Sequence, residues 1–196
     1  MKDLMIILLN SIFVKNIVLA QFLGICSFLG VSRNLKTAMG MSEAVIVVMV
    51  LATAITYPIQ YGILAPNNMA FMQTLIFILV IAALVQIIEA IMKKSMKGLY
   101  KALGIYLPLI TTNCAILGVA INNINYEYSF VEAIVNSLGT GLGYMLAMFL
   151  FAGIRGFMDD CDIPNSMKGL PITLVAAAIV SVSFFGFKGI AEGLFM

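Results

Sequence analysis

Residues 26–31 read CSFLGV and residues 114–119 read CAILGV, so a cysteine, a leucine, a glycine and a valine recur in the same order. A weaker similarity follows each copy, with SEAV at residues 42–45 and VEAI at residues 131–134. Two matches in the same order indicate an internal repeat. The chain therefore divides into two related halves.

The rest of the sequence is strongly apolar. Of 196 residues, 62% are hydrophobic, whereas soluble domains have roughly 45–50% apolar residues. Apolar segments near the roughly 20 residues needed to cross a bilayer occur at about 4–31, 42–63, 70–92, 99–121, 129–154 and 170–191. The sequence predicts an all-α integral membrane protein of six transmembrane helices, forming a single transmembrane domain over residues 1–196.

The position of the repeat predicts how the helices are arranged. An odd number of helices separates the two copies, so the second half must enter the membrane from the opposite side. We expect two inverted three-helix repeats, at about residues 1–93 and 94–196, with helices 1 and 4 interrupted. Residues 15–16 and Gly24 should break the first helix, and Pro108 with residues 111–113 the fourth.

Basic residues predict the orientation in the membrane. Most of them fall on one face, which should be cytoplasmic: Arg33, Lys36, Lys93, Lys94, Lys97, Lys101, Arg155 and Lys168. The opposite face holds Lys2 and Lys188 and almost nothing else basic. Both termini are therefore predicted to be extracytoplasmic.

The composition excludes several kinds of chemistry. The formal net charge is only +2, and the apolar segments leave no room for the basic stripe that nucleic-acid binding needs. Histidine is absent, which excludes imidazole metal ligands and Ser-His-Asp or Cys-His catalysis. Any chemistry must use other groups.

The repeated cysteines, Cys26 and Cys114, are the candidate metal ligands. A lone cysteine in an apolar helix is usually a small hydrophobic residue, but here it recurs beside a predicted break in both halves. This pattern favours iron–sulfur ligation, which ordinarily needs four cysteines. Cys161 lies in the acidic stretch at residues 159–162 and is predicted to be a surface residue that binds no metal. A cluster would therefore be shared with a second subunit.

Other residues are given structural interpretations. Glu43 and Glu132 are predicted to be carboxylates at helix starts, and Glu89 is assigned to a pairing with Lys93 in preference to an ion path. Glycines in the fifth span predict close helix contact; they are Gly139, Gly141, Gly143 and Gly153.

Several longer stretches resemble a known family. They read FLGICSFLGVS at residues 22–32, LGIYLPLITTNCA at 103–115, AGIR at 152–155 and GFKG at 186–189. They resemble the A-subunit family of Rnf electron-transport complexes, and the resemblance extends over essentially the whole chain. It implies a subunit, without activity of its own, of a ferredoxin:NAD oxidoreductase that translocates Na⁺ or H⁺ across a bacterial or archaeal cell membrane.

The resemblance also implies a cofactor and a partner. A homologous, oppositely oriented subunit would share one [2Fe-2S] cluster with this chain, held by Cys26, Cys114 and the two equivalent cysteines of that subunit. The cluster would relay electrons across the bilayer between cofactors on other subunits.

Three alternatives remain open. The E subunit of the sodium-pumping NADH:quinone oxidoreductase has a similar pattern, although Thr112 and residues 21–22 favour Rnf. A small secondary transporter would also have inverted repeats and broken helices, but it should carry polar substrate ligands where this chain has cysteines. A purely structural scaffold is the third alternative.

Overall fold

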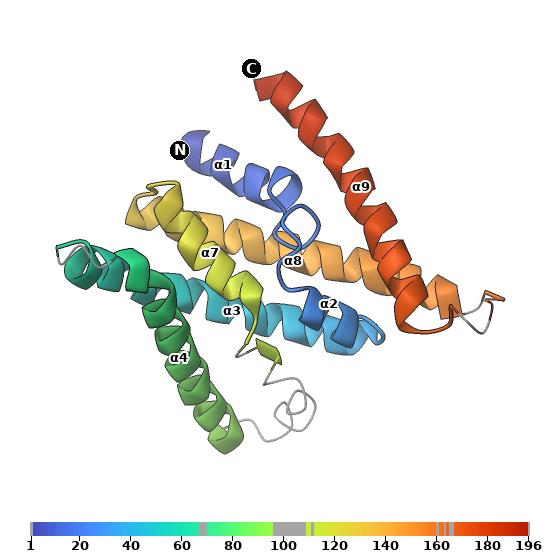
Figure 1. The fold of residues 1–196 in the computed structure, drawn as a ribbon, viewed down its shortest axis with the longest axis horizontal. Helices are drawn as coiled ribbons and strands as arrows, with labels where there is room; N and C mark the ends of the chain where they lie inside the picture. Colours follow the sequence, from blue (N-terminus) through green and yellow to red (C-terminus); the bar gives the residue numbers. More distant parts are fainter. Residues whose placement is uncertain are drawn as a thin grey trace.

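A computed structural model describes residues 2–66, 70–95, 109–110, 112–159, 161–162, 164 and 167–195, and its regular elements are all helices (Figure 1). In the first half they are α1 (Lys2–Leu9), the π-helix η1 (Asn10–Val14), α2 (Ile25–Val31), α3 (Leu35–Ile59), the π-helix η2 (Gln60–Leu64), the 3₁₀ helix η3 (Ala70–Met72) and α4 (Gln73–Ser95). In the second half they are α7 (Cys114–Asn125), α8 (Phe130–Asp159) and α9 (Leu170–Phe195).

The apolar segments of the sequence are helical in the structure. Among the described residues, three helices are long and apolar enough to cross a membrane: Leu35–Leu64, Gln73–Ile91 and Phe130–Met158. Shorter apolar helices are Leu4–Val14, Cys114–Asn125 and Leu170–Gly186. Each of the six predicted segments contains one of these helices or overlaps it, so the prediction of an all-helical membrane protein is confirmed.

The antiparallel pair α3 and α8 forms the centre of the molecule (Figure 1). Gly141 of α8 lets the pair approach closely, because a Cβ atom there would lie 2.8 Å from Cγ1 of Ile46. The N-terminal segment packs on Gly139 and Gly143 of α8. A Cβ atom on Gly139 would lie 3.1 Å from the backbone oxygen of Leu8, and a Cβ atom on Gly143 would lie 3.1 Å from the backbone oxygen of Ile12. The predicted close contacts are confirmed at these three glycines.

Two structural interpretations from the sequence were wrong. Within the described part of the chain, no atom outside the helix's own backbone lies within 4 Å of a Cβ placed on Gly153, so the expected close helix contact is not made there. Glu43 lies well inside α3, which begins at Leu35, and its side chain is exposed. By contrast, Glu132 does act at a helix start: its carboxylate accepts hydrogen bonds from the Ser129 N–H (2.9 Å) and Oγ (2.8 Å).

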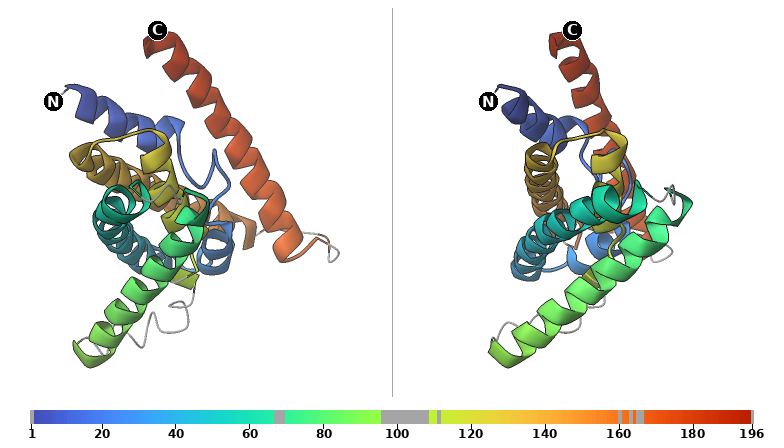
Figure 2. Two further views of the ribbon diagram at one scale, coloured as in Figure 1. Left: turned by 60° about the vertical axis from the view of Figure 1, so that its left-hand side comes forward. Right: turned by 90° about the vertical axis from the view of Figure 1, so that its left-hand side faces the viewer.

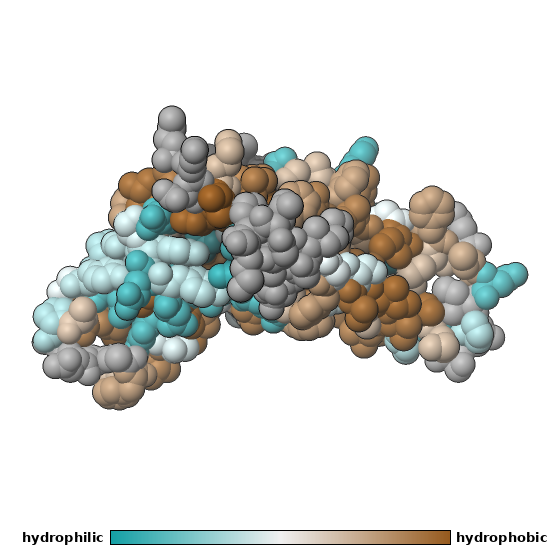
Figure 3. Space-filling view, turned by 90° about the horizontal axis from the view of Figure 1, so that it is seen from above, coloured by the Kyte–Doolittle hydropathy of each residue, from teal (hydrophilic) through white to brown (hydrophobic). Residues whose placement is uncertain are grey.

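Polar groups gather at the ends of the α3–α8 pair. In Figure 3 hydrophilic residues lie mainly at the two ends of the long axis, and most of the visible surface between them is hydrophobic. Arg33, Arg155 and Lys168, all predicted to be cytoplasmic, line one pocket. Lys15 lies beside Tyr126 at the other end of α8. The sequence predicted almost no basic residues on the extracytoplasmic face, and Lys15 adds one basic residue to that face. Lys97 and Lys101 lie outside the described residues.

Helices α4 and α9 diverge from the central pair in both views of Figure 2. Their apolar side chains are widely exposed, for example Leu79 (69%) and Val182 (73%). Such surfaces are stable only when lipid or other apolar groups cover them. These exposed apolar surfaces indicate that the protein resides in a lipid bilayer.

Candidate functional site

The first membrane segment is broken between Val14 and Ile25, as the sequence predicted. Asn16, which is fully buried, supplies the missing hydrogen bonds: its Oδ1 accepts from the N–H groups of Val18 (3.1 Å) and Leu19 (3.3 Å). Ser181 of α9 donates to the Leu19 carbonyl. Irregular backbone is tolerated at membrane depth only when its polar groups are satisfied in this way.

The break brings the two cysteine motifs together. Gly24, the N-cap of α2, has a φ of 81°, a left-handed conformation that favours glycine. Its N–H donates to Sγ of Cys114 at 2.9 Å. A Cβ atom on Gly24 would lie 3.2 Å from Cβ of Ala115, so the two chain segments are in close contact. Cys26 is only two residues further along the same segment.

The second motif begins a helix. Cys114 is the first residue of α7, and Oδ1 of Asn113 accepts a hydrogen bond from the Ala115 N–H at 3.0 Å, which is an N-cap. The N-terminus of a helix carries partial positive charge and stabilises a thiolate. Residues 103–108 and Thr111, expected to complete the fourth helix and its break, lie outside the described residues.

A buried hydroxyl pair joins α8 to both motifs. The Tyr144 hydroxyl donates to Oγ of Ser27 at 2.9 Å, and Ser27 donates to the Gly24 carbonyl at 2.8 Å. Asn113 contacts the same Ser27 oxygen at 3.4 Å.

The two repeated cysteines are not enclosed by the described part of the chain. The residue Cys26 is exposed and Cys114 is half-buried. Among the described residues, no group of three or more Cys, Asp or Glu side chains is placed to hold a metal ion. The sequence has three cysteines, so its own thiols could not complete a cluster with four cysteine ligands.

Known proteins match the chain from end to end. Residues 4–191 match the family described as "Rnf-Nqr subunit, membrane protein". The chain belongs to the Rnf-Nqr family. It is 54% identical over 190 residues to the A subunit of the Na⁺-translocating ferredoxin:NAD⁺ oxidoreductase complex of Acetobacterium woodii, covering 97% of this chain and 99% of that one.

Further members of the Rnf-Nqr family are similar over their full length. The A subunit of the ion-translocating oxidoreductase complex of Syntrophotalea carbinolica is 49% identical over 193 residues, covering 98% of this chain and 100% of that one. The protein with the same description from Pseudoalteromonas atlantica is 43% identical over 192 residues, with the same two coverages. The resemblance to the A-subunit family is confirmed.

Cys161 of this Rnf-Nqr chain lies apart from the other two cysteines. It follows the end of α8, is exposed, and its thiol donates to the Phe157 carbonyl at 3.4 Å. It lines the basic pocket that contains Arg33 and Lys168. The sequence predicted acidic surroundings for this thiol, whereas the structure places arginine and lysine side chains beside it; that Cys161 binds no metal stays a prediction.

The variant Cys161→Ser should leave electron transfer and iron content nearly unchanged, because an exposed thiol outside the site supplies no ligand. The measurement is iron per complex and ferredoxin:NAD activity of membranes carrying the variant, compared with wild type. Loss of iron in Cys161→Ser would show that the ligand assignment is wrong.

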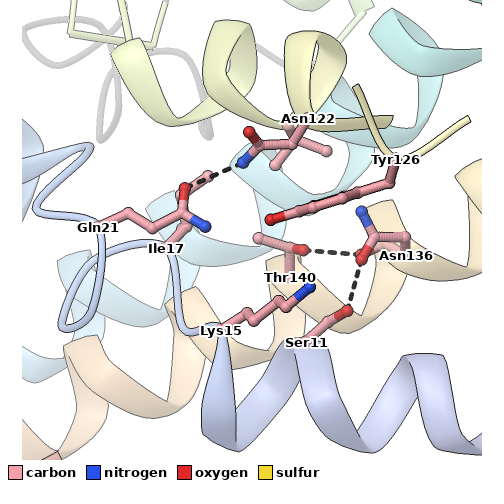
Figure 4. Close-up of a pocket in the computed structure, with 9 residues that line it drawn as sticks. Ser11, Lys15, Ile17, Gln21, Asn122, Tyr126, Asn136 and Thr140 are labelled. Carbon is pink, nitrogen blue, oxygen red and sulfur yellow. Dashed lines mark hydrogen bonds between the residues drawn. The ribbon is translucent and has the colours of Figure 1, made fainter. Parts of the chain in front are cut away.

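A second polar cluster, missed from the sequence, lies between η1, α7 and α8 (Figure 4). Asn136 of α8 accepts a hydrogen bond from Ser11 and donates to Oδ1 of Asn123 at 2.6 Å. Asn122 donates to Oε1 of Gln21 at 2.9 Å. The cavity among these groups has a volume of about 10 Å³, room for roughly one water molecule.

The polar residues of α8 could have been found from the sequence. Asn136, Ser137, Thr140 and Tyr144 recur at helical spacing and are all buried. Polar side chains in a membrane helix usually face the protein interior, so this spacing marks the inner face of α8.

Proposed function

We propose that this chain is the A subunit of an Rnf-type complex, an ion-translocating ferredoxin:NAD⁺ oxidoreductase, and that it relays electrons across the bilayer. The relative from Acetobacterium woodii, whose name states this activity with Na⁺, matches over nearly the whole of both chains. The observation that carries the site is the hydrogen bond from Gly24 N–H to Cys114 Sγ, which joins the two cysteine motifs. The chain has no activity outside the complex, and the translocated ion is Na⁺ or H⁺.

Cys26 and Cys114 each supply one thiolate to a [2Fe-2S] cluster, and a homologous, oppositely oriented subunit supplies the other two. Support comes from the exposure of the thiols, from the N–H group that donates to one sulfur, and from the helix start at Cys114. When bound, the cluster accepts and donates single electrons. The residues of this chain would hold the cluster. The Gly24 N–H group and the N-terminus of α7 would place partial positive charge beside the Cys114 sulfur.

The chain forms six transmembrane helices in two inverted repeats, at about residues 1–93 and 94–196. The directions of α2 and α7 support this arrangement, because the helices run from the cysteines toward opposite ends of α8 (Figure 1). Arg155, near the end of α8, donates to the Leu29 carbonyl of α2 at 2.7 Å. Helix α7 instead ends at Asn125, just before α8 begins.

The end that carries Arg33, Arg155 and Lys168 is cytoplasmic, and both termini are extracytoplasmic, because basic residues are retained on the cytoplasmic side. A reporter that works only outside the cytoplasm should be active when it is fused after Met196. A reporter that works only inside the cytoplasm should be active when it is fused after Ser95. A cytoplasmic signal at Met196 contradicts both the orientation and the inverted repeats.

Spectroscopy of the purified complex separates this function from a transporter. The complex should show the visible absorption and, after reduction, the EPR signal of a [2Fe-2S] cluster, whereas the chain expressed alone should show neither. A complex without such a signal contradicts the proposal. The alternative, the E subunit of a NADH:quinone oxidoreductase, is disfavoured by the names of the relatives, which are A subunits of Rnf or ion-translocating oxidoreductases.

A further inference from the structure

Tyr144 is a buried polar residue without a part in the proposed function. Its side chain is 0% exposed, yet it lies in contact with the site: a Cβ atom on Gly24 would lie 3.4 Å from Cε2 of its ring. A hydroxyl group is costly to bury unless it forms a hydrogen bond. The partner of Tyr144 is Ser27, which is itself 0% exposed.

A chain of hydrogen bonds leads from Tyr144 to the sulfur of Cys114. Tyr144 donates to Ser27, Ser27 donates to the carbonyl of Gly24, and the N–H of Gly24 donates to Cys114 Sγ. Gly24 has the wide conformational freedom of glycine, so its orientation depends on what its carbonyl and N–H contact. The carbonyl of Gly24 accepts from Ser27 and also from the Phe28 N–H at 3.0 Å, so the hydroxyl pair and the start of α2 together hold this residue and limit the directions open to its N–H group.

We propose that Tyr144 is a positioning residue that holds Gly24, through Ser27, so that its N–H points at the Cys114 sulfur and sets the reduction potential of the bound cluster. This inference rests on the proposed function. A hydrogen bond to a ligating sulfur stabilises the additional negative charge of the reduced cluster, and therefore raises its reduction potential.

Tyr144→Phe keeps the ring that packs on Gly24 and removes only the hydroxyl. Ser27→Ala removes the acceptor and leaves Tyr144 in place. Ser137→Ala is the matched control, because Ser137 is a fully buried hydroxyl on the same helix. Its partners are Thr53 (2.7 Å), the Asn123 amide (3.1 Å) and the Ala133 carbonyl (2.8 Å), none of which belongs to a cysteine motif. Each variant loses one buried oxygen.

The measurement is an EPR-monitored redox titration of the purified complex, with iron content and subunit composition checked. We expect a lower midpoint potential and a changed EPR line shape in Tyr144→Phe and in Ser27→Ala, and the wild-type potential in Ser137→Ala. If Tyr144→Phe does not assemble, Ser27→Ala alone decides. Wild-type potential and line shape in both site variants overturn the inference.

A second measurement separates this inference from the proposed function. A wild-type complex without a [2Fe-2S] signal contradicts the proposed function, but the hydrogen-bond chain can still be tested in that protein. With Cys26 and Cys161 changed to serine, maleimide should label Cys114 more slowly in Tyr144→Phe than in Ser137→Ala, because a sulfur that has lost the Gly24 N–H donor is less readily ionised and the thiolate is the reactive form. Equal labelling rates overturn the positioning role.

Discussion

Cys26→Ser and Cys114→Ser should each remove the [2Fe-2S] cluster from the assembled complex and reduce ferredoxin:NAD electron transfer to background. In the proposed site two of the four thiolates come from this chain, and oxygen does not replace sulfur well as a ligand in these clusters. The substitution changes the side-chain volume little, so packing losses should be small. Loss of a ligand therefore has a far larger effect than loss of packing.

The measurements for these variants are iron content, the EPR signal and turnover, after confirming that all subunits are present. Cys161→Ser is the matched control, because it makes the same chemical change outside the site. A Cys26→Ser or Cys114→Ser complex with the full cluster signal and normal turnover would show that both cysteines serve only for packing.

Gly139→Leu and Gly143→Leu should each prevent stable assembly of the protein. A side chain at either position collides with backbone of the N-terminal segment, at Leu8 or at Ile12. Overpacking of this kind costs about 1–3 kcal/mol. Displacing the segment also breaks the bonds from Ser11 to Asn136 and from Asn16 to the Gly143 carbonyl, and each buried group left unpaired adds about 1–3 kcal/mol.

The yield and the midpoint of thermal unfolding in detergent measure this effect. Gly153→Leu is the matched control on the same helix, because no described residue outside the helix backbone has an atom within 4 Å of its Cβ position. We expect Gly153→Leu to resemble wild type, and the other two to fall well below it. Equal stability of all three variants would contradict the close packing of the N-terminal segment on α8.

The break before Cys26 and the helix start at Cys114 were predictable because helix-breaking and helix-starting residues have local signals in the sequence. Gly24 and Asn113 show this: one needs a left-handed conformation and the other is a good N-cap, and both act as their residue types suggest. The prediction for Glu43 was wrong because a carboxylate beside an apolar segment resembles a helix start, whereas α3 already begins at Leu35.

The partners of buried polar groups could not be predicted. Tyr144 and Ser27 are far apart in the sequence, and only the packing of α8 against α2 brings them together. Asn16 likewise donates a hydrogen bond to the Gly143 carbonyl, because Gly143 has no side chain to keep the two segments apart. Such pairings depend on tertiary contacts, which a pattern in one segment does not encode.

The broken first segment has a consequence for biogenesis. In its irregular backbone between Val14 and Ile25, the Leu19 carbonyl accepts a hydrogen bond from Ser181 of α9, and the Asn16 side chain that caps Val18 and Leu19 is itself held by the Gly143 carbonyl of α8. Both of these partners are synthesised long after the segment has left the ribosome. Bare peptide groups cost several kcal/mol in lipid. The segment that enters the membrane first therefore reaches its final shape last, and until α8 and α9 arrive it must remain as a continuous helix or beside the insertion machinery.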